Sequence, residues 1–181
     1  MGLINSIRAA RRKSDAVNSL YLMCVEQARS PAFFTYLSIP DTVDGRFDMI
    51  IFHTMLLIRR LRGEGDAADE TSQAVLNLMF SDMDRNLREM GVGDLSVGKQ
   101  VKKMAKAFYG RAEAWETALD AGLEELAAAL VDSIYRSVEA SEAQIKALGA
   151  YAEAADKYLK GQTLDDLLAG TLKFPAVLAQ S

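Results

Sequence analysis

The sequence contains very few of the residues that cross-link chains or bind metals. Its 181 residues include one cysteine, Cys24, and one histidine, His53. A single cysteine forms no internal disulfide, which favours a reducing compartment. A zinc or haem site at His53 would need a further ligand, and the chain offers no second histidine or second cysteine. We therefore predict no metal and no cofactor, and we expect His53 to be a hydrogen-bonded residue of the core.

Long apolar runs, strand patterns and flexible tracts are also missing. The most apolar segment, residues 47–61, is far shorter than the ~20 residues that span a membrane. No segment shows the strict alternation of a strand, and no Asn-Gly pair marks a hairpin. Three prolines and no long polar tract argue against disordered linkers. A net charge of −4 argues against a general affinity for nucleic acid, so we expect no specific DNA partner.

Apolar residues recur three or four positions apart along most of the chain, which is the spacing of one helix face. This pattern predicts an all-α fold, a single helical domain of about seven or eight helices. We expect helices over roughly residues 18–28, 31–37, 42–61, 71–90, 96–119, 123–137, 141–159 and 163–169. The segment 47–61 is apolar nearly all round, so we expect a central helix packed on an apolar stripe of the helix 96–119. That stripe consists of Val97, Val101, Met104, Phe108, Ala112, Trp115 and Leu119.

The first 17 residues form a basic amphipathic segment, which we separate from a helical domain over residues 18–181. Such a segment can lie on an anionic membrane surface. The residues that would contact the membrane are Ile4, Ile7, Arg8, Arg11, Arg12 and Lys13. The alternative is a frayed first helix whose basic side chains keep it in solution. The segment lacks the continuous apolar core of a secretory signal, so we expect a cytoplasmic protein.

Acids, arginines, glycines and lysines follow one another closely between Ser81 and Arg111. We expect one helix to end near Met90, with Gly91 in the positive φ that closes a helix, and another to begin with Ser96 as its cap. Exposed ion pairs contribute only about 0–1 kcal/mol each, so stability is a poor reason to gather many charges here. At an interface, the same charges can steer a partner. The predicted partner-binding residues are Arg46, Asp48, Asp82, Asp84, Arg85, Arg88, Glu89, Asp94, Lys99, Lys102, Lys103, Tyr109 and Arg111.

Two familiar motifs are matched only in part within this stretch. Residues 93–100 fit the phosphate-binding pattern G-x-x-x-x-G-K, but Gln100 stands where Mg²⁺ binding needs serine or threonine. Residues 82–93 begin like a calcium loop, but Leu87 and Gly93 stand where glycine and glutamate are required. We therefore expect no catalytic residue and no enzyme. Anion binding at the loop 91–99 stays open as an alternative function.

Local patterns give two further expectations. We expect Asp82 and Asp84 to form ion pairs with Arg85, Arg88 or the lysines beyond the loop. Gly110 lies inside an expected helix, where glycine costs about 1 kcal/mol relative to alanine. We expect close packing against a neighbouring helix to explain this glycine, with the approach of a partner as the alternative.

The chain also resembles a known family in two ungapped segments. These are D-M-D-R-N-L-R-E-M-G-V-G-D-L-S-V-G-K with the following A-F-Y-G-R, and the earlier A-R-S-P-A-F-F-T-Y-L-S-I-P-D-T-V-D-G-R-F-D. Across roughly residues 20–120, the chain resembles the ubiquinol–cytochrome c chaperone family. The resemblance implies a helical, non-enzymatic assembly factor for respiratory complex III.

The same resemblance implies a partner and a location. The partner is newly synthesised cytochrome b, handled near the ribosome. The location is the cytoplasmic face of the inner membrane in a bacterium, or the matrix side in a mitochondrion. A peripheral membrane adaptor, tethered through the first 13 residues, is the second alternative that the sequence leaves open.

Overall fold

Helices make up every regular element of the part of the chain that the structure describes. The computed structural model describes residues 2–177, with side chains from residue 7 onward. Its helices are α1 (Gly2–Ala28), α2 (Pro31–Thr35), α3 (Val43–Leu61), α4 (Asp66–Glu89), α5 (Asp94–Ala121), α6 (Leu123–Ser133), α7 (Glu142–Lys160) and α8 (Leu164–Leu168). No strand occurs in this range. The predicted all-α fold and the expected number of helices are confirmed.

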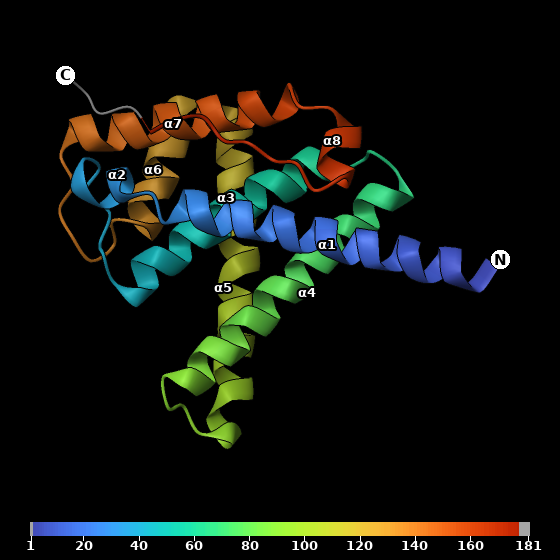
Figure 1. Cartoon of the computed structure of the whole chain (residues 1–181). Helices are drawn as coiled ribbons and strands as arrows, with labels where there is room; N and C mark the ends of the chain where they lie inside the picture. The colour runs from blue at the N-terminus through green and yellow to red at the C-terminus, as the bar shows by residue number, and fades with distance from the viewer. Residues whose placement is uncertain (1, 178–181) are drawn as a thin grey trace.

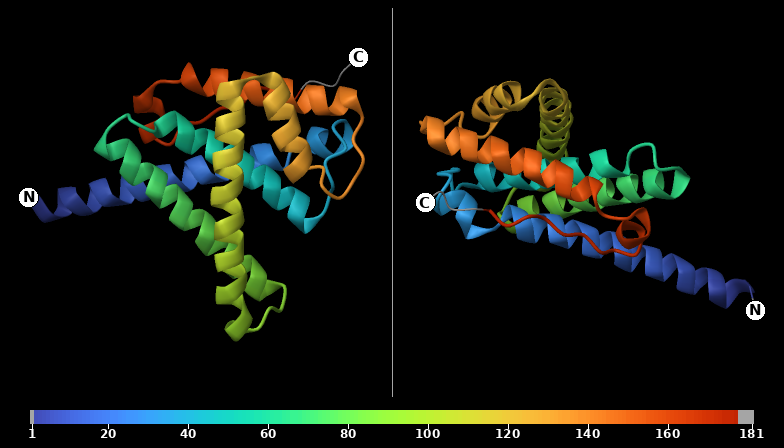
Figure 2. Two further views of the ribbon diagram at one scale, coloured as in Figure 1. Left: turned by 180° about the vertical axis from the view of Figure 1, so that it is seen from behind. Right: turned by 90° about the horizontal axis from the view of Figure 1, so that it is seen from above.

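Helix α3 is the centre of the molecule. It contacts α1 and α4 on one side and α5 and α7 on the other, and the views in Figures 1 and 2 show it enclosed by them. Its side chains from Ile51 to Leu57 are all buried, which is why this segment is apolar nearly all round. The Phe52 ring meets the Trp115 ring of α5 edge to face, with the centroids 5.5 Å apart. The predicted packing of α3 on α5 is therefore confirmed.

The start of α3 is fixed by a cap and by a close backbone contact. The Gly45 N–H donates a hydrogen bond to the Thr42 hydroxyl oxygen at 3.1 Å, as expected of an N-cap threonine. A Cβ atom at residue 45 would lie 2.0 Å from the Pro40 carbonyl oxygen, so only glycine fits there. The turn before α3 thus depends on one residue that has no side chain.

Three predicted helix starts are wrong. Helix α1 runs without interruption through Asn18 and Ser19, whose side chains favour a helix start at that point in the sequence. Helix α4 begins at Asp66, and Thr71 is a buried residue inside it whose hydroxyl donates to the Ala67 carbonyl at 2.8 Å. Helix α5 begins at Asp94, two residues before Ser96, without a side-chain cap. The predicted end of α4 is confirmed, since Gly91 has a φ of 84°.

Two elements extend beyond the body of the molecule. The end of α4, the turn after it and the beginning of α5 project together as a helical hairpin, which we call the arm (residues 82–106) (Figure 1). The first half of α1 projects in a different direction, and every residue from Ile7 to Asp15 is exposed. The predicted apolar stripe on α5 therefore lies partly in the arm and partly in the main core. Phe108 and Trp115 join the main core, whereas Val97 is buried within the arm and outside that core.

The two unusual core residues, His53 and Cys24, are fully buried near each other in the fold. His53 Nδ1 lies 2.8 Å from the Met49 carbonyl oxygen, and Nε2 lies 2.8 Å from the Tyr151 hydroxyl. Because the carbonyl only accepts, Nδ1 carries the proton and Nε2 accepts from Tyr151. The expectation of a hydrogen-bonded core histidine is confirmed. Cys24 is fully buried, and this burial raises the pKa of its thiol.

Burial of His53 makes the protein less stable in acid. Burial lowers the pKa of His53 to about 4, against a small opposing effect of the hydrogen bond to Met49. The unfolded chain has the ordinary value near 6.5, so it binds the proton first as the pH falls. Stability from this group is complete above pH 6.5 and is lost between pH 6.5 and 4. We expect urea denaturation at pH 4.5 to give a free energy of unfolding about 2–3 kcal/mol below that at pH 7.5.

A His53→Gln variant provides the comparison for this experiment. Glutamine does not titrate, so most of the loss between the two pH values is expected to disappear, although the variant starts from a lower stability. An equal loss in both proteins would assign the pH dependence to other groups.

The prediction that Gly110 is needed for close packing is wrong. A Cβ atom at this position would meet no atom within 4 Å, and the residue is exposed within α5. Gly149 on α7 differs, because its Cβ would lie 3.1 Å from the Leu123 side chain. We expect Gly110→Ala to raise the free energy of unfolding by about 0.5–1 kcal/mol, since alanine costs less entropy in a helix.

A thermal melt of Gly110→Ala beside Gly149→Ala tests this difference. The first is expected to melt higher than the unchanged protein and the second no higher. If Gly110→Ala melts lower, the glycine has a structural role after all.

Candidate docking surface

The arm contains three ion pairs, of which one, Arg88–Asp94, joins its two helices. Arg88 on α4 donates from Nε to Asp84 at 2.6 Å, and it also pairs with Asp94, the first residue of α5. One turn earlier, Arg85 pairs with Asp82. The predicted pairing of these acids with the arginines is confirmed, so neither aspartate is free to build a calcium loop.

Asp82 also ties the base of the arm to α1. Its side chain is largely covered, and it accepts a hydrogen bond from the Tyr21 hydroxyl at 3.0 Å. Burial and the nearby carboxylate together raise the pKa of Tyr21, so its hydroxyl keeps its proton and donates. Asp84, Glu89 and Asp94 lie further along the arm, and the last two are exposed. The arm therefore carries acidic side chains along its length, and the end that joins the body is fixed by the contact of Asp82 with α1.

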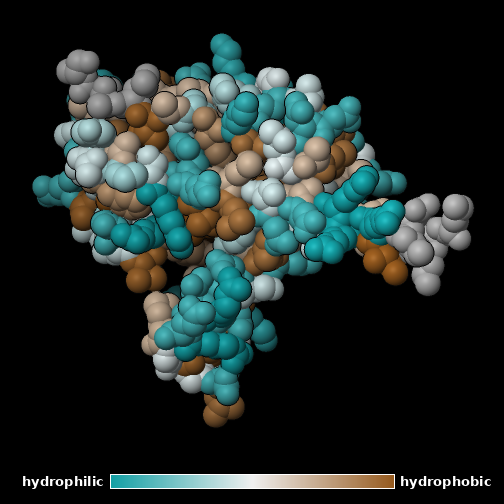
Figure 3. All heavy atoms as spheres, in the orientation of Figure 1, coloured by the Kyte–Doolittle hydropathy of each residue, from teal (hydrophilic) through white to brown (hydrophobic). Residues whose placement is uncertain are grey.

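Four lysines on one side of α5 form a second feature of the arm, which we call the lysine face. Each of the four is exposed, and within the described residues none lies within 4 Å of a carboxylate oxygen. Two large apolar side chains flank the turn at the end of the arm: Leu95 is fully exposed and Met90 is 57% exposed. Apolar atoms are visible at that end in Figure 3. The lysine face consists of Lys99, Lys102, Lys103 and Lys106.

Tyr109 lies where the arm joins the body. Its ring packs against Phe108, with the centroids 5.3 Å apart, and more loosely against Phe80 of α4. More than half of its side chain remains exposed. Tyr109 thus combines aromatic contacts at the junction with an exposed surface.

Asp48 is not part of an exposed surface, which corrects its predicted position. Its side chain is completely buried, and it accepts hydrogen bonds from Arg111 of α5 and from Arg136. Arg136 follows α6 and also lies 3.6 Å from Asp44. Burial raises the pKa of the Asp48 carboxyl, and the two guanidinium groups oppose that change. Asp48 and Arg111 therefore join α3, α5 and the end of α6.

Arg46 is exposed. It is far from the arm in sequence, and its contacts are with other residues. Its Nε donates to Asp41 at 2.5 Å, and its guanidinium carbon lies 5.8 Å from the centre of the Phe34 ring. The hydrogen bond from Arg46 lowers the pKa of Asp41. Both contacts are local, so the structure does not connect Arg46 with the arm residues. Its role in docking stays a prediction.

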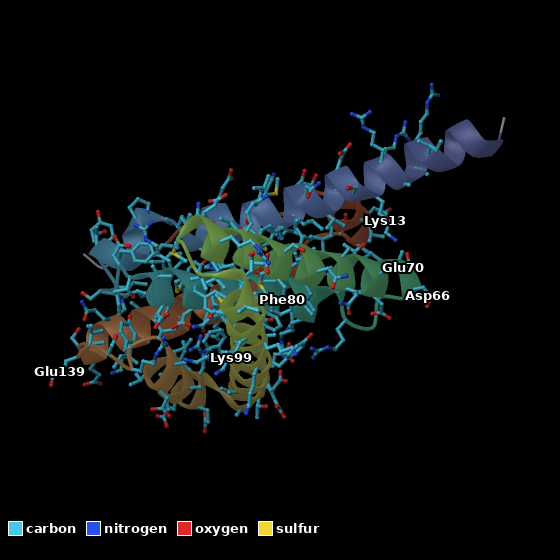
Figure 4. The ribbon with its side chains drawn as sticks, turned by 90° about the horizontal axis from the view of Figure 1, so that it is seen from below. Lys13, Asp66, Glu70, Phe80, Lys99 and Glu139 are labelled. Carbon is cyan, nitrogen blue, oxygen red and sulfur yellow. The ribbon has the colours of Figure 1, made fainter. Side chains whose placement is uncertain are left out.

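The exposed half of α1 carries the predicted membrane-contacting residues. Ile7, Arg8, Arg11 and Arg12 are exposed, while Ile4 is outside the residues whose side chains are described. Lys13 differs from the arginines because it pairs with Glu70 of α4. Figure 4 shows these two partners side by side at the edge of the body. Among the described residues, no helix is both long and apolar enough to cross a membrane.

The position of Asp94 disfavours the alternative of an anion site at the loop 91–99. The first turn of a helix attracts anions through its free N–H groups, and Asp94 already places a carboxylate there. That carboxylate is in turn paired with Arg88. Within the described residues, no group of three or more metal-binding side chains is found.

The fold and this surface define the class: an all-α protein with a charged, projecting helical hairpin. A family described as Ubiquinol-cytochrome C chaperone matches residues 35–174, so the chain belongs to that family. The resemblance in the two sequence segments is thereby confirmed.

Similar proteins agree with this assignment. The chain is 24% identical over 169 residues to the mouse protein "Ubiquinol-cytochrome c reductase complex assembly factor 1", covering 93% of this chain and 57% of the mouse protein. The human protein of the same name is also 24% identical, with 56% of its length covered. The chain thus spans just over half the length of these relatives. The "Crystal structure of the Cbp3 homolog from Brucella abortus" is 34% identical, with 98% of both chains covered and a TM-score of 0.89.

Proposed function

We propose that this protein is an assembly chaperone that binds newly synthesised cytochrome b and holds it until the other parts of complex III join. The observation that carries the proposal is membership of the ubiquinol-cytochrome c chaperone family, together with close structural similarity to a Cbp3 homolog along the whole chain. Chaperones of this kind act by binding, and no catalytic step is part of the proposal.

The arm is the surface that we propose for the client. Loops of a membrane protein on the cytoplasmic or matrix side are rich in lysine and arginine. The arm carries four acids at Asp82, Asp84, Glu89 and Asp94, of which Glu89 has no ion pair within the described residues. Glu89 complements a basic loop directly, whereas the three aspartates already share Arg85 and Arg88. Opposite charges raise the rate at which partners meet. A client of this kind implies that the protein works at the inner face of the membrane, beside the ribosome that makes the client, and we include this location in the proposal.

Reversal of two acids on the arm tests this assignment. We expect Asp84→Lys/Glu89→Lys to lower the amount of cytochrome b that co-purifies from detergent-solubilised membranes by about tenfold, because like charges repel at an interface. The melting temperature is expected to change little, since exposed ion pairs add little stability. Complex III content in the same strain should fall with the co-purification.

The matched control carries the same charge change on α7, in Glu142→Lys/Glu153→Lys. Both replaced residues are exposed, and the control is expected to retain cytochrome b. If the two variants capture equal amounts, the client binds elsewhere and the arm assignment is wrong. If neither the variants nor the unchanged protein captures cytochrome b, the proposed client is wrong.

A further inference from the structure

The lysine face is an unneutralised cationic strip on an acidic protein. Residues 95–112 contain four lysines and one arginine but no acid, in a chain whose net charge is −4. The positions 99, 102, 103 and 106 are three or four apart, so they share one side of α5. Of the five lysines elsewhere, Lys13, Lys146 and Lys160 are each paired with a carboxylate, whereas Lys157 and Lys173 stand singly and form no cluster. The lysine face therefore keeps its charge available for an anionic partner.

The apolar side chains at the end of the arm indicate which kind of anionic partner the lysine face binds. Leu95 and Met90 are exposed on either side of the turn between α4 and α5, and apolar atoms are visible at that end of the arm in Figure 3. Leu95 precedes Lys99 by one helical turn. A single exposed leucine is ordinary on a protein surface. Aliphatic side chains beside a row of lysines, with a tyrosine at the other end, are instead typical of segments that lie at a membrane surface.

Other anionic or apolar partners fit less well. Nucleic acid phosphates would match the lysines but leave Leu95 and Met90 without a contact. The client's own loops are expected to be basic on this side of the membrane, so the lysines would repel them. Anionic lipid headgroups match the lysines, and acyl chains match the two apolar residues.

We propose that the lysine face and the end of the arm lie on the surface of an anionic lipid bilayer. Lys99, Lys102, Lys103 and Lys106 contact the headgroups, while Leu95 and Met90 enter the boundary of the acyl region. This inference rests on the proposed function, because the client's basic loops exclude the client as the lysines' partner. The arm then has two surfaces with different partners: the acids bind the client, and the lysines bind the membrane in which the client is embedded.

Flotation of the purified full-length chain with vesicles tests the proposal. We expect binding to phosphatidylcholine vesicles that contain 30% phosphatidylglycerol, little binding to phosphatidylcholine alone, and a marked decrease between 50 and 300 mM salt. Lys102→Glu/Lys106→Glu is expected to lower the bound fraction about tenfold. The control, Lys146→Glu/Lys157→Glu on α7, makes the same charge change and is expected to bind like the unchanged protein. Met90→Ser/Leu95→Ser should remove the binding that persists at high salt.

Several results would overturn this inference. One is equal binding by the α5 and α7 variants. Another is loss of binding in Arg8→Glu/Arg11→Glu alone, which would place the membrane contact on α1 instead. Binding of the unchanged protein to RNA but not to vesicles would make nucleic acid the partner. Circular dichroism of each variant excludes misfolding. If the protein binds vesicles but does not capture cytochrome b, the proposed client is wrong and the lipid contact stands. If it captures cytochrome b but does not bind vesicles, only the lipid contact is wrong.

Discussion

A Leu57→Asp variant is expected to be unfolded at 25 °C and to show no cooperative thermal transition. Leu57 is fully buried in α3, the helix that contacts α1, α4, α5 and α7. An aspartate there would be a buried charge without a partner, which costs far more than an exposed one. Domains of this size are stable by only about 5–15 kcal/mol, so this single substitution is enough to remove the folded state.

The matched control for this experiment is Leu57→Met, which keeps the volume and the apolar character of the side chain. Such substitutions cost less than about 1.5 kcal/mol, so this variant should melt cooperatively at a slightly lower temperature. Circular dichroism at 222 nm during heating distinguishes the two. A cooperative melt of Leu57→Asp near that of the unchanged protein would show that α3 is not the centre of the core.

Asp48→Ala is expected to lower the free energy of unfolding by about 3–5 kcal/mol, the cost of breaking a buried ion pair by removing one partner. The Asp48 carboxylate is fully buried and accepts hydrogen bonds from both Arg111 and Arg136. Without it, Arg111 loses its ion pair, and Arg136 keeps the more distant Asp44 as its acidic partner among the described residues, together with its hydrogen bond to the Ser133 carbonyl. Urea denaturation of the purified variant measures the loss.

A variant in which apolar side chains replace Asp48, Arg111 and Arg136 together distinguishes the loss of ion pairs from the loss of side-chain volume. Replacing a buried ionic group by apolar side chains of similar size is often neutral for stability. Asp48→Leu/Arg111→Leu/Arg136→Met is therefore expected to recover most of the stability that Asp48→Ala loses. A loss below about 1 kcal/mol in Asp48→Ala would show that water, rather than the two arginines, satisfies this carboxylate.

Helix content and core were predictable because they depend on local spacing. The apolar period placed α3 at the centre, and Gly91 marked the end of α4, since both signals lie within a few residues. The missed helix starts have the same origin. Asn18 and Ser19 resemble caps but occur inside α1, because the alanines and arginines before them continue the helix. Asp66 and Asp69 could have indicated the true start of α4 by their charge in its first turn.

The candidate site was predictable only where its contacts join residues of the same helix. The pairs Asp82–Arg85 and Asp84–Arg88 follow from spacing, and so does the lysine face. The burial of Asp48 does not, because its partner Arg136 is 88 residues away in sequence. No local pattern indicates such a pair, since only the tertiary fold brings the segment that follows α6 to the beginning of α3. Tertiary contacts of this kind explain why the burial of Asp48 and its pairing with Arg111 could not be predicted.

The burial of Cys24 makes the unaltered chain suitable for site-specific labelling. Thiol reagents attack the exposed thiolate, and Cys24 is both fully covered and held in its protonated form by its surroundings. A cysteine introduced at Leu95 would thus be labelled alone, and a fluorophore there could follow the arm as it meets a vesicle or a client. Slow modification of Cys24 itself would then measure how often α1 separates from α3, since its thiol points to the His53 carbonyl oxygen at 3.8 Å.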